Sequence, residues 1–118
     1  MRYLLLICNR DEQWLSPSPD EQPAMLQQYR EFTQSVQASG RMQGGYALEA
    51  SSTATTLRVR DGKVLTTDGP FAETKEQLVG YYVVDANDLD EALAIAARIP
   101  GARWGAVEVR PVRVMGGG

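Results

Sequence analysis

The residues most able to do chemistry lie in the stretch LTTDGPFAETKEQLVGYY. Asp68 supplies a carboxylate and Tyr81 and Tyr82 supply phenols, and a carboxylate beside a phenol can move a proton. An Asp in a turn usually accepts the backbone N–H two residues on, but here that residue is Pro70, which has none. One interpretation is structural: Asp68 accepts the N–H of Phe71 as a cap, and Phe71 fills a gap in the core. The other is functional: Asp68 lies at a pocket mouth with Tyr81 or Tyr82 as its phenolic partner.

Three further residues are candidates for substrate binding, namely Tyr46, Arg58 and Phe71. Arg58 is read first as an exposed strand residue, although an arginine that faces a cavity would bind a carboxylate well. Tyr46 follows a glycine pair and is read first as a packed strand residue, with a ligand contact as the second interpretation. The chain has no histidine, which removes the commonest metal ligand and the commonest general base. Since no metal-ligand cluster and no phosphate loop is present either, the sequence predicts no metal and no cofactor.

The bulk composition indicates one globular domain, residues 1–118. The chain is 43% apolar and 23% charged, with a net charge of −3. That acidic balance argues against direct nucleic-acid binding, which needs a basic face. The longest apolar run near the start, residues 3–8, is too short for a membrane span or a signal peptide, so we expect a cytoplasmic, bacterial-type protein. The lone Cys8 lies in that run and is predicted to be a buried, inert thiol.

Periodicity and turn signals divide the chain into strands and helices. A helix beginning near Ser18–Asp20 and ending at Gly40 is predicted, with Met25, Tyr29, Phe32 and Val36 forming its apolar stripe. Asp88 opens a second helix, which Pro100-Gly101 ends. The predicted strands are residues 2–8, 41–48, 55–60, 63–67, 78–85 and 104–112, with a polar loop at 9–19 and a flexible tail at about 114–118.

This order of elements is typical of an α+β protein with a ferredoxin-like βαββαβ plan and an inserted β-hairpin. Right-handed crossovers place both helices on one face of the antiparallel sheet. Residues 3–8 and 81–84 are nevertheless apolar on both sides of their strands, so the second face also needs a cover. We expect a homodimer in which two sheets face each other.

The hairpin register follows from its turn, Asp61-Gly62, the preferred pair for a two-residue loop. Counting back from that turn places Thr55 opposite Asp68. Because side chains alternate between faces, Asp68 shares a face with Leu57 and Val59, whereas Arg58 points the other way. An ion pair between Asp68 and Arg58 is therefore not expected.

Residues 54–112, ATTLRVRDGKVLTTDGPFAETKEQLVGYYVVDANDLDEALAIAARIPGARWGAVEVRPV, closely resemble the DGPF branch of the YCII-related proteins. The opening MRYLLLIC and the first helix are similar as well, so the resemblance covers essentially the whole chain. It implies a dimeric α+β barrel of ferredoxin-like subunits. After the glycine pair the family pattern has an acidic residue, where this chain has Tyr46.

The resemblance also bears on function. Some related proteins resemble enzymes that isomerise, dehalogenate or cleave small ring compounds, and a histidine paired with an aspartate has been put forward for the YCII branch. This chain has no histidine, so that pair does not carry over. We expect a protein, enzyme or not, that binds or transforms a small aromatic or anionic metabolite near Asp68 without a metal. The alternative, implied by relatives encoded beside alternative sigma factors, is a non-enzymatic dimer that modulates a transcription regulator such as a sigma factor.

Overall fold

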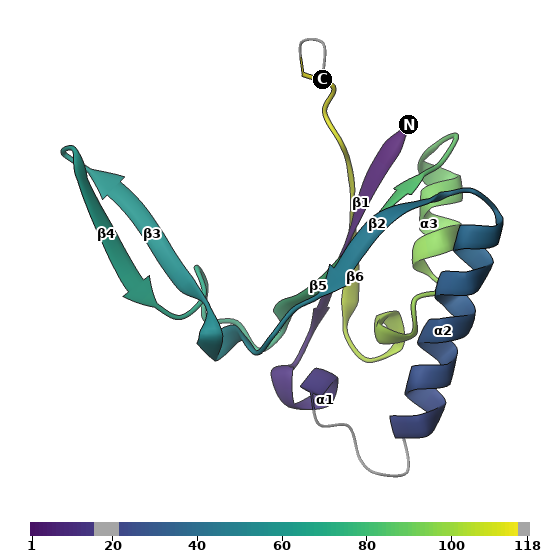
Figure 1. Ribbon diagram of the computed structural model, residues 1–118, viewed down its shortest axis with the longest axis horizontal. Helices are drawn as coiled ribbons and strands as arrows, with labels where there is room; N and C mark the ends of the chain where they lie inside the picture. Colours follow the sequence, from purple (N-terminus) through teal and green to yellow (C-terminus); the bar gives the residue numbers. More distant parts are fainter. Residues whose placement is uncertain (16–21, 116–118) are drawn as a thin grey trace.

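The computed structural model describes residues 1–15 and 22–115 (Figure 1). Their elements, in chain order, are β1 Arg2–Asn9, α1 Asp11–Leu15, α2 Gln22–Ala38, β2 Met42–Ala47, the 3₁₀ turn η1 Ser51–Thr53, β3 Thr55–Arg60, β4 Lys63–Asp68, β5 Gln77–Asp85, α3 Leu89–Ala96, the 3₁₀ turn η2 Pro100–Arg103, and β6 Ala106–Pro111.

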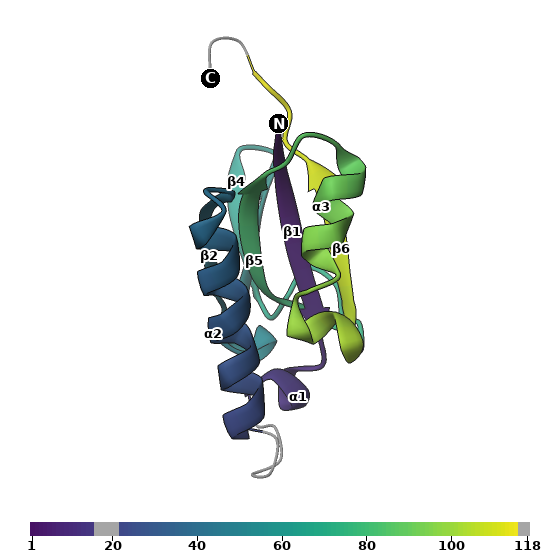
Figure 2. The same ribbon diagram turned by 90° about the vertical axis from the view of Figure 1, so that its right-hand side faces the viewer.

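Four strands form one antiparallel sheet in the order β2-β5-β1-β6, and β3 and β4 form a separate two-stranded sheet. Helices α2 and α3 both cover the same face of the four-stranded sheet (Figure 2). This is the ferredoxin-like arrangement with a hairpin inserted between β2 and β5. The predicted α+β fold, with two helices on one sheet face, is confirmed.

The core lies between that sheet face and the two helices. In β1, Tyr3, Leu5 and Ile7 point toward the helices and are almost fully buried. Leu4 and Leu6 point to the opposite face and are only partly buried, because no described part of the chain packs over them. The remaining core side chains include Phe32, Val36, Val79, Val84, Ala92, Ile95 and Ile99.

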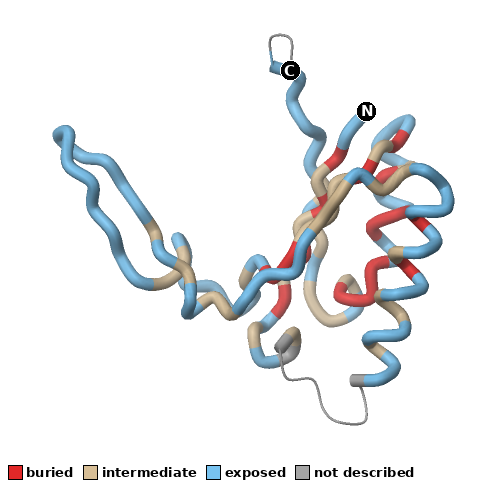
Figure 3. The backbone as a smooth tube through the Cα atoms, viewed as in Figure 1, coloured by how far each residue is buried: buried red, intermediate tan, exposed pale blue. Residues whose placement is uncertain are grey.

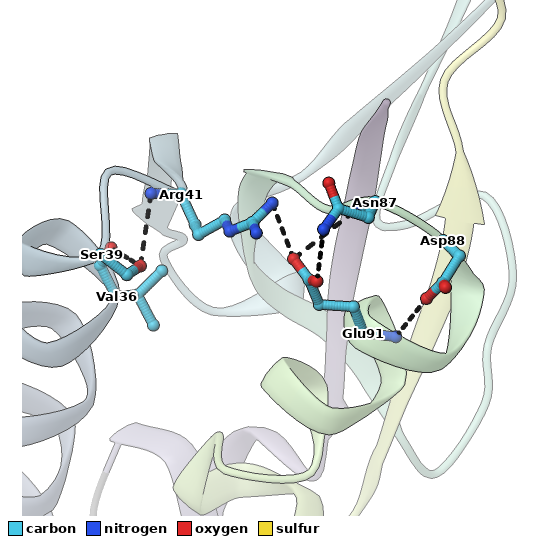
Figure 4. Close-up of polar contacts among 6 residues, drawn as sticks. All are labelled: Val36, Ser39, Arg41, Asn87, Asp88 and Glu91. Atoms are coloured by element: carbon cyan, nitrogen blue, oxygen red, sulfur yellow. Dashed lines mark hydrogen bonds and ion pairs between the residues drawn. The ribbon is translucent and has the colours of Figure 1, made fainter.

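The ends of the helices follow local rules that the sequence carries. Gly40 follows α2 with a positive φ of 76°, and its N–H donates to the Gln37 carbonyl, so the predicted helix end is confirmed. Asp88 caps α3 by accepting the N–H of Glu91 (Figure 4). The predicted loop at 9–19 is wrong in part, because residues 11–15 form the short helix α1. The predicted cap at Ser18–Asp20 lies outside the described residues.

Glycines inside a strand suggest a bulge or a close approach of another backbone, and the glycine pair in β2 shows both. The register with β5 shifts between Met42 and Gly44, which is a bulge. At Gly45 the β5 backbone comes so close that an added Cβ would overlap the Tyr81 carbonyl oxygen. Gly44 has no such neighbour within 4 Å.

The β3–β4 hairpin has the predicted register throughout, from Arg60 opposite Lys63 to Thr55 opposite Asp68. Its turn residues have the positive φ values that such a loop needs, 51° at Asp61 and 73° at Gly62. The hairpin extends away from the four-stranded sheet on the side opposite α2 and α3 (Figure 1). It is exposed along most of its length (Figure 3).

Two further observations concern the chain as a whole. Within residues 1–15 and 22–115, no helix combines the length and the apolar character needed to cross a membrane. Of the expected C-terminal tail, Val114 and Met115 are exposed, and residues 116–118 lie outside the described part of the chain.

Candidate ligand-binding site

A broad depression lies at the base of the hairpin, where the chain leaves β2 for β3 and returns from β4 to β5. Its volume is about 770 Å³. We call it the basal depression. Apolar atoms dominate its lining, and two carboxylates, those of Glu49 and Glu76, also contribute. Its lining residues are Cys8, Leu48–Ser51, Thr53–Thr56, Pro70–Ala72, Thr74 and Glu76–Leu78.

The DGPF segment enters this depression through Gly69. The Gly69 N–H donates to the Ala54 carbonyl at 2.7 Å, and its own carbonyl accepts the Thr56 hydroxyl at 2.9 Å. These two bonds hold Gly69 against the start of β3. Its φ of +104° is one that residues with a side chain rarely adopt. The turn made there directs Pro70 and Phe71 into the lining of the depression.

Phe71 is an exposed aromatic rather than a core residue, with 78% of its surface accessible. The structural interpretation, in which Phe71 fills a gap in the core, therefore does not apply. The Arg58 guanidinium lies over its ring, 5.3 Å from the centroid, a cation–π geometry. Two of the predicted binding residues, Arg58 and Phe71, are thus brought together at the edge of the basal depression.

Asp68, the last residue of β4, is exposed and does not itself line the depression. Thr55, directly opposite Asp68, does line it. Within the described residues, neither a hydrogen bond nor an ion pair involves the Asp68 carboxylate, and the Phe71 N–H does not donate to it. The capping bond that the structural interpretation requires is absent from this part of the chain.

The two candidate tyrosines face opposite sides of the sheet, as adjacent strand residues must. Tyr82 points toward the helices and packs against Phe32, with ring centroids 5.1 Å apart. Tyr81 points to the open face and packs against Tyr46 at 6.2 Å. The structure therefore joins Tyr81 to Tyr46, and no contact described here joins Asp68 to either candidate phenol.

A polar contact that no sequence pattern predicts lies beside the basal depression. The Asp11 carboxylate of α1 accepts the Ser51 N–H at 3.2 Å and also the Ser51 hydroxyl. The two residues are 40 positions apart and belong to no motif. They line a smaller polar depression of about 480 Å³ with Arg10, Glu12, Glu73, Thr74, Lys75 and Gln77. Ser51, Thr74 and Gln77 are common to both depressions.

The electrostatics of the basal depression disfavour thiolate chemistry. Burial, with smaller contributions from Glu108 and Glu76, raises the pKa of the Cys8 thiol. A raised pKa keeps the thiol protonated near neutral pH and therefore weakly nucleophilic. Over the described ranges, no three cysteine, aspartate or glutamate side chains gather as metal ligands would.

Comparison with known proteins places this geometry in context. The YCII-related domain model matches residues 1–116. An uncharacterised protein of Rhizobium meliloti (strain 1021) is 36% identical over 110 residues, which covers 91% of this chain and 89% of that protein.

Proposed function

Since this chain belongs to the YCII-related family, we propose that it binds a small aromatic molecule in the basal depression. The observation that supports this most directly is Phe71. A phenylalanine that is 78% exposed and held by the Gly69 turn, in a depression lined mainly by apolar atoms, offers a ring face to a planar ligand.

The charges near the depression refine the ligand class. Glu49 and Glu76 line it, so a ligand with a diffuse negative charge is disfavoured there. Arg58, stacked on Phe71, would accommodate one anionic substituent at the hairpin side. Asp68 lies next to the same turn and would accept a hydrogen bond from a ligand hydroxyl or amine. Because no described contact joins Asp68 to a tyrosine, binding is better supported than proton transfer.

Titration of ¹⁵N-labelled protein with phenol, benzoate and cyclohexanecarboxylate tests this proposal. We expect phenol and benzoate, but not the non-aromatic acid, to shift the amide resonances of Gly69, Phe71 and Ala72. Phe71→Ala should weaken binding by about two- to twelve-fold, since an aromatic pair contributes about 0.5–1.5 kcal/mol. Leu26→Ala, an exposed apolar change on α2 and away from the basal depression, is the matched control and should leave binding unchanged.

Asp68→Asn separates the role of the carboxylate from that of the ring. If Asp68 accepts a ligand hydroxyl, this variant should bind phenol more weakly and benzoate no more weakly than wild type. The proposal fails if neither aromatic probe shifts the amide resonances of Gly69, Phe71 and Ala72 at millimolar concentration. It also fails if Phe71→Ala binds both probes as well as wild type does.

We infer that the functional unit is a homodimer in which the open sheet faces meet. Leu4, Leu6, Tyr81 and Val83 lie on the face that α2 and α3 do not cover, and they are only partly buried. An apolar sheet face of this kind needs a cover. Light scattering at micromolar concentration should give twice the chain mass. A monomer would refute the inference and leave this face for another protein, as the transcription-regulator alternative requires.

A further inference from the structure

We call the β3–β4 hairpin, Thr55–Asp68, the arm. Of the strands that the structure describes, those of the arm pack least against the rest of the chain. Every residue from Leu57 to Asp68 is exposed. The ladder places Leu57, Val59 and Val64 on one face, where 58%, 56% and 63% of their surfaces are accessible. An isolated two-stranded ribbon is marginally stable in water, so an arm of this composition needs a second surface to pack against.

The overall dimensions are those of a subunit that exposes more surface than a compact monomer does. The radius of gyration is 16.2 Å, whereas a compact domain of this length has about 13.5 Å. The accessible surface is 8121 Å², against about 6,300 Å² for a folded monomer of this mass. The excess of roughly 1,800 Å² is larger than the roughly 800 Å² that each partner contributes to a standard interface, and suits a subunit of an obligate homodimer.

Charge also favours a second copy of this chain as the partner. The arm contains Arg58, Arg60 and Lys63 against the acids Asp61 and Asp68, a net charge of +1. The whole chain has −3, so the remainder has −4. Within the described residues, none of these three cations forms an ion pair. A basic arm on an otherwise acidic chain is complementary to the body of an identical chain.

We propose that, where the two open sheet faces meet, the arm packs across the second copy of this chain, with Leu57, Val59 and Val64 against the partner subunit. The arm projects on the same side of the molecule as that uncovered face (Figure 1). A two-fold axis therefore lets each chain supply an arm and receive one, so one identical partner covers both exposed surfaces. The proposal rests on the homodimer inferred above and adds the element that holds it together.

A charge-pair variant tests the arm without unfolding it. Val59 and Val64 are directly opposite each other, so Val59→Lys/Val64→Glu replaces an apolar pair by an opposite-charge pair that supports the hairpin. We expect its dimer dissociation constant, measured by sedimentation velocity over a dilution series, to rise about 100-fold or more. Leu65→Glu is the matched control, because Leu65 is the next residue of β4, points to the opposite face and is similarly exposed at 50%. It should change the dissociation constant by less than about threefold.

Amide hydrogen exchange supplies an independent readout on the unmodified protein. Amides of residues 57–65 should become protected as the protein concentration rises through the dissociation constant, while amides of α2 and α3 change little. A wild-type chain that stays monomeric overturns both the homodimer and the arm. If the wild type is a dimer but Val59→Lys/Val64→Glu has the same dissociation constant, the proposed role of the arm is overturned and the homodimer stands. The same holds if the arm amides of the wild-type dimer stay unprotected. Neither result bears on ligand binding at Phe71, which is measured separately.

Discussion

Replacing Gly45 by alanine is the sharpest test of the packing of β2 against β5. An added Cβ would overlap the Tyr81 carbonyl oxygen and lie 2.9 Å from the Cδ1 atom of Tyr82. The nearest of these atoms is backbone, which cannot rotate away as a flexible side chain would. The φ of +154° adds strain for any residue with a side chain. The edge strand β2 must therefore move away from β5.

The size of the loss follows from this overlap. Overpacking of a close-packed contact costs about 1–3 kcal/mol. For a chain of 118 residues, an unfolding entropy of about 2.1 cal/mol/K per residue makes 1 kcal/mol equal to about 4 °C in Tm. Gly45→Ala should therefore lower Tm by about 4–12 °C.

Gly44→Ala is the matched control, since nothing described lies within 4 Å of its added Cβ. It should change the free energy of unfolding by less than about 1 kcal/mol, on the stabilising side, because alanine restricts the unfolded chain more than glycine does. Thermal unfolding by circular dichroism should compare the two variants at one protein concentration, because association makes Tm depend on concentration. If Gly45→Ala unfolds within about 2 °C of Gly44→Ala, the close approach of β5 at Gly45 is wrong.

Three further predictions concern stability. Burial raises the pKa of Tyr29 to about 12, above the ordinary value of about 10. As the pH rises, Tyr29 therefore ionises in the unfolded chain before it ionises in the folded one. The stability of the wild type should accordingly fall from pH 10 to pH 12. Urea unfolding of Tyr29→Phe should show no such fall in stability between pH 10 and pH 12. At pH 8 the variant should also lose about 1–3 kcal/mol of unfolding free energy, because the Gly101 N–H loses the Tyr29 hydroxyl that accepts it at 3.0 Å. The Arg41 guanidinium lies 2.7 Å from the Glu91 carboxylate (Figure 4), and both side chains are about one-third exposed. Arg41→Gln should therefore lower the unfolding free energy by no more than about 1 kcal/mol. That loss should shrink in molar salt if the pair is electrostatic and persist if it is not. Asp88→Ala removes the cap of α3 and should lower the unfolding free energy by about 1 kcal/mol, whereas an unchanged urea midpoint would show that the cap contributes nothing.

Local chemistry explains which parts of the fold the sequence predicts. The register of the arm follows from Asp61-Gly62 because a two-residue turn leaves one way to pair the flanking strands. The start of α3 follows from Asp88, whose carboxylate satisfies a helix N–H within the same few residues. The continuous apolar run along β1 indicates a sheet with two apolar faces, and the structure places one of these faces under the helices.

The candidate site was less predictable, because its residues meet through contacts between distant segments. Asp11 and Ser51 lie 40 positions apart, and α1 forms where polar composition predicts a loop. That Phe71 is exposed rather than buried depends on the arm leaving the sheet, a direction that no local pattern encodes.

Sequence alone determined the ferredoxin-like order of elements, the register of the arm and the opposite orientations of Tyr81 and Tyr82, because each depends on hydrogen bonds and side-chain alternation within a few residues. Only the tertiary structure decided that Arg58 stacks on Phe71, that the Phe71 N–H does not bind Asp68, and that the arm leaves the sheet uncovered on one face. These outcomes depend on where separate elements pack in space, and packing is set by the whole chain rather than by any one segment.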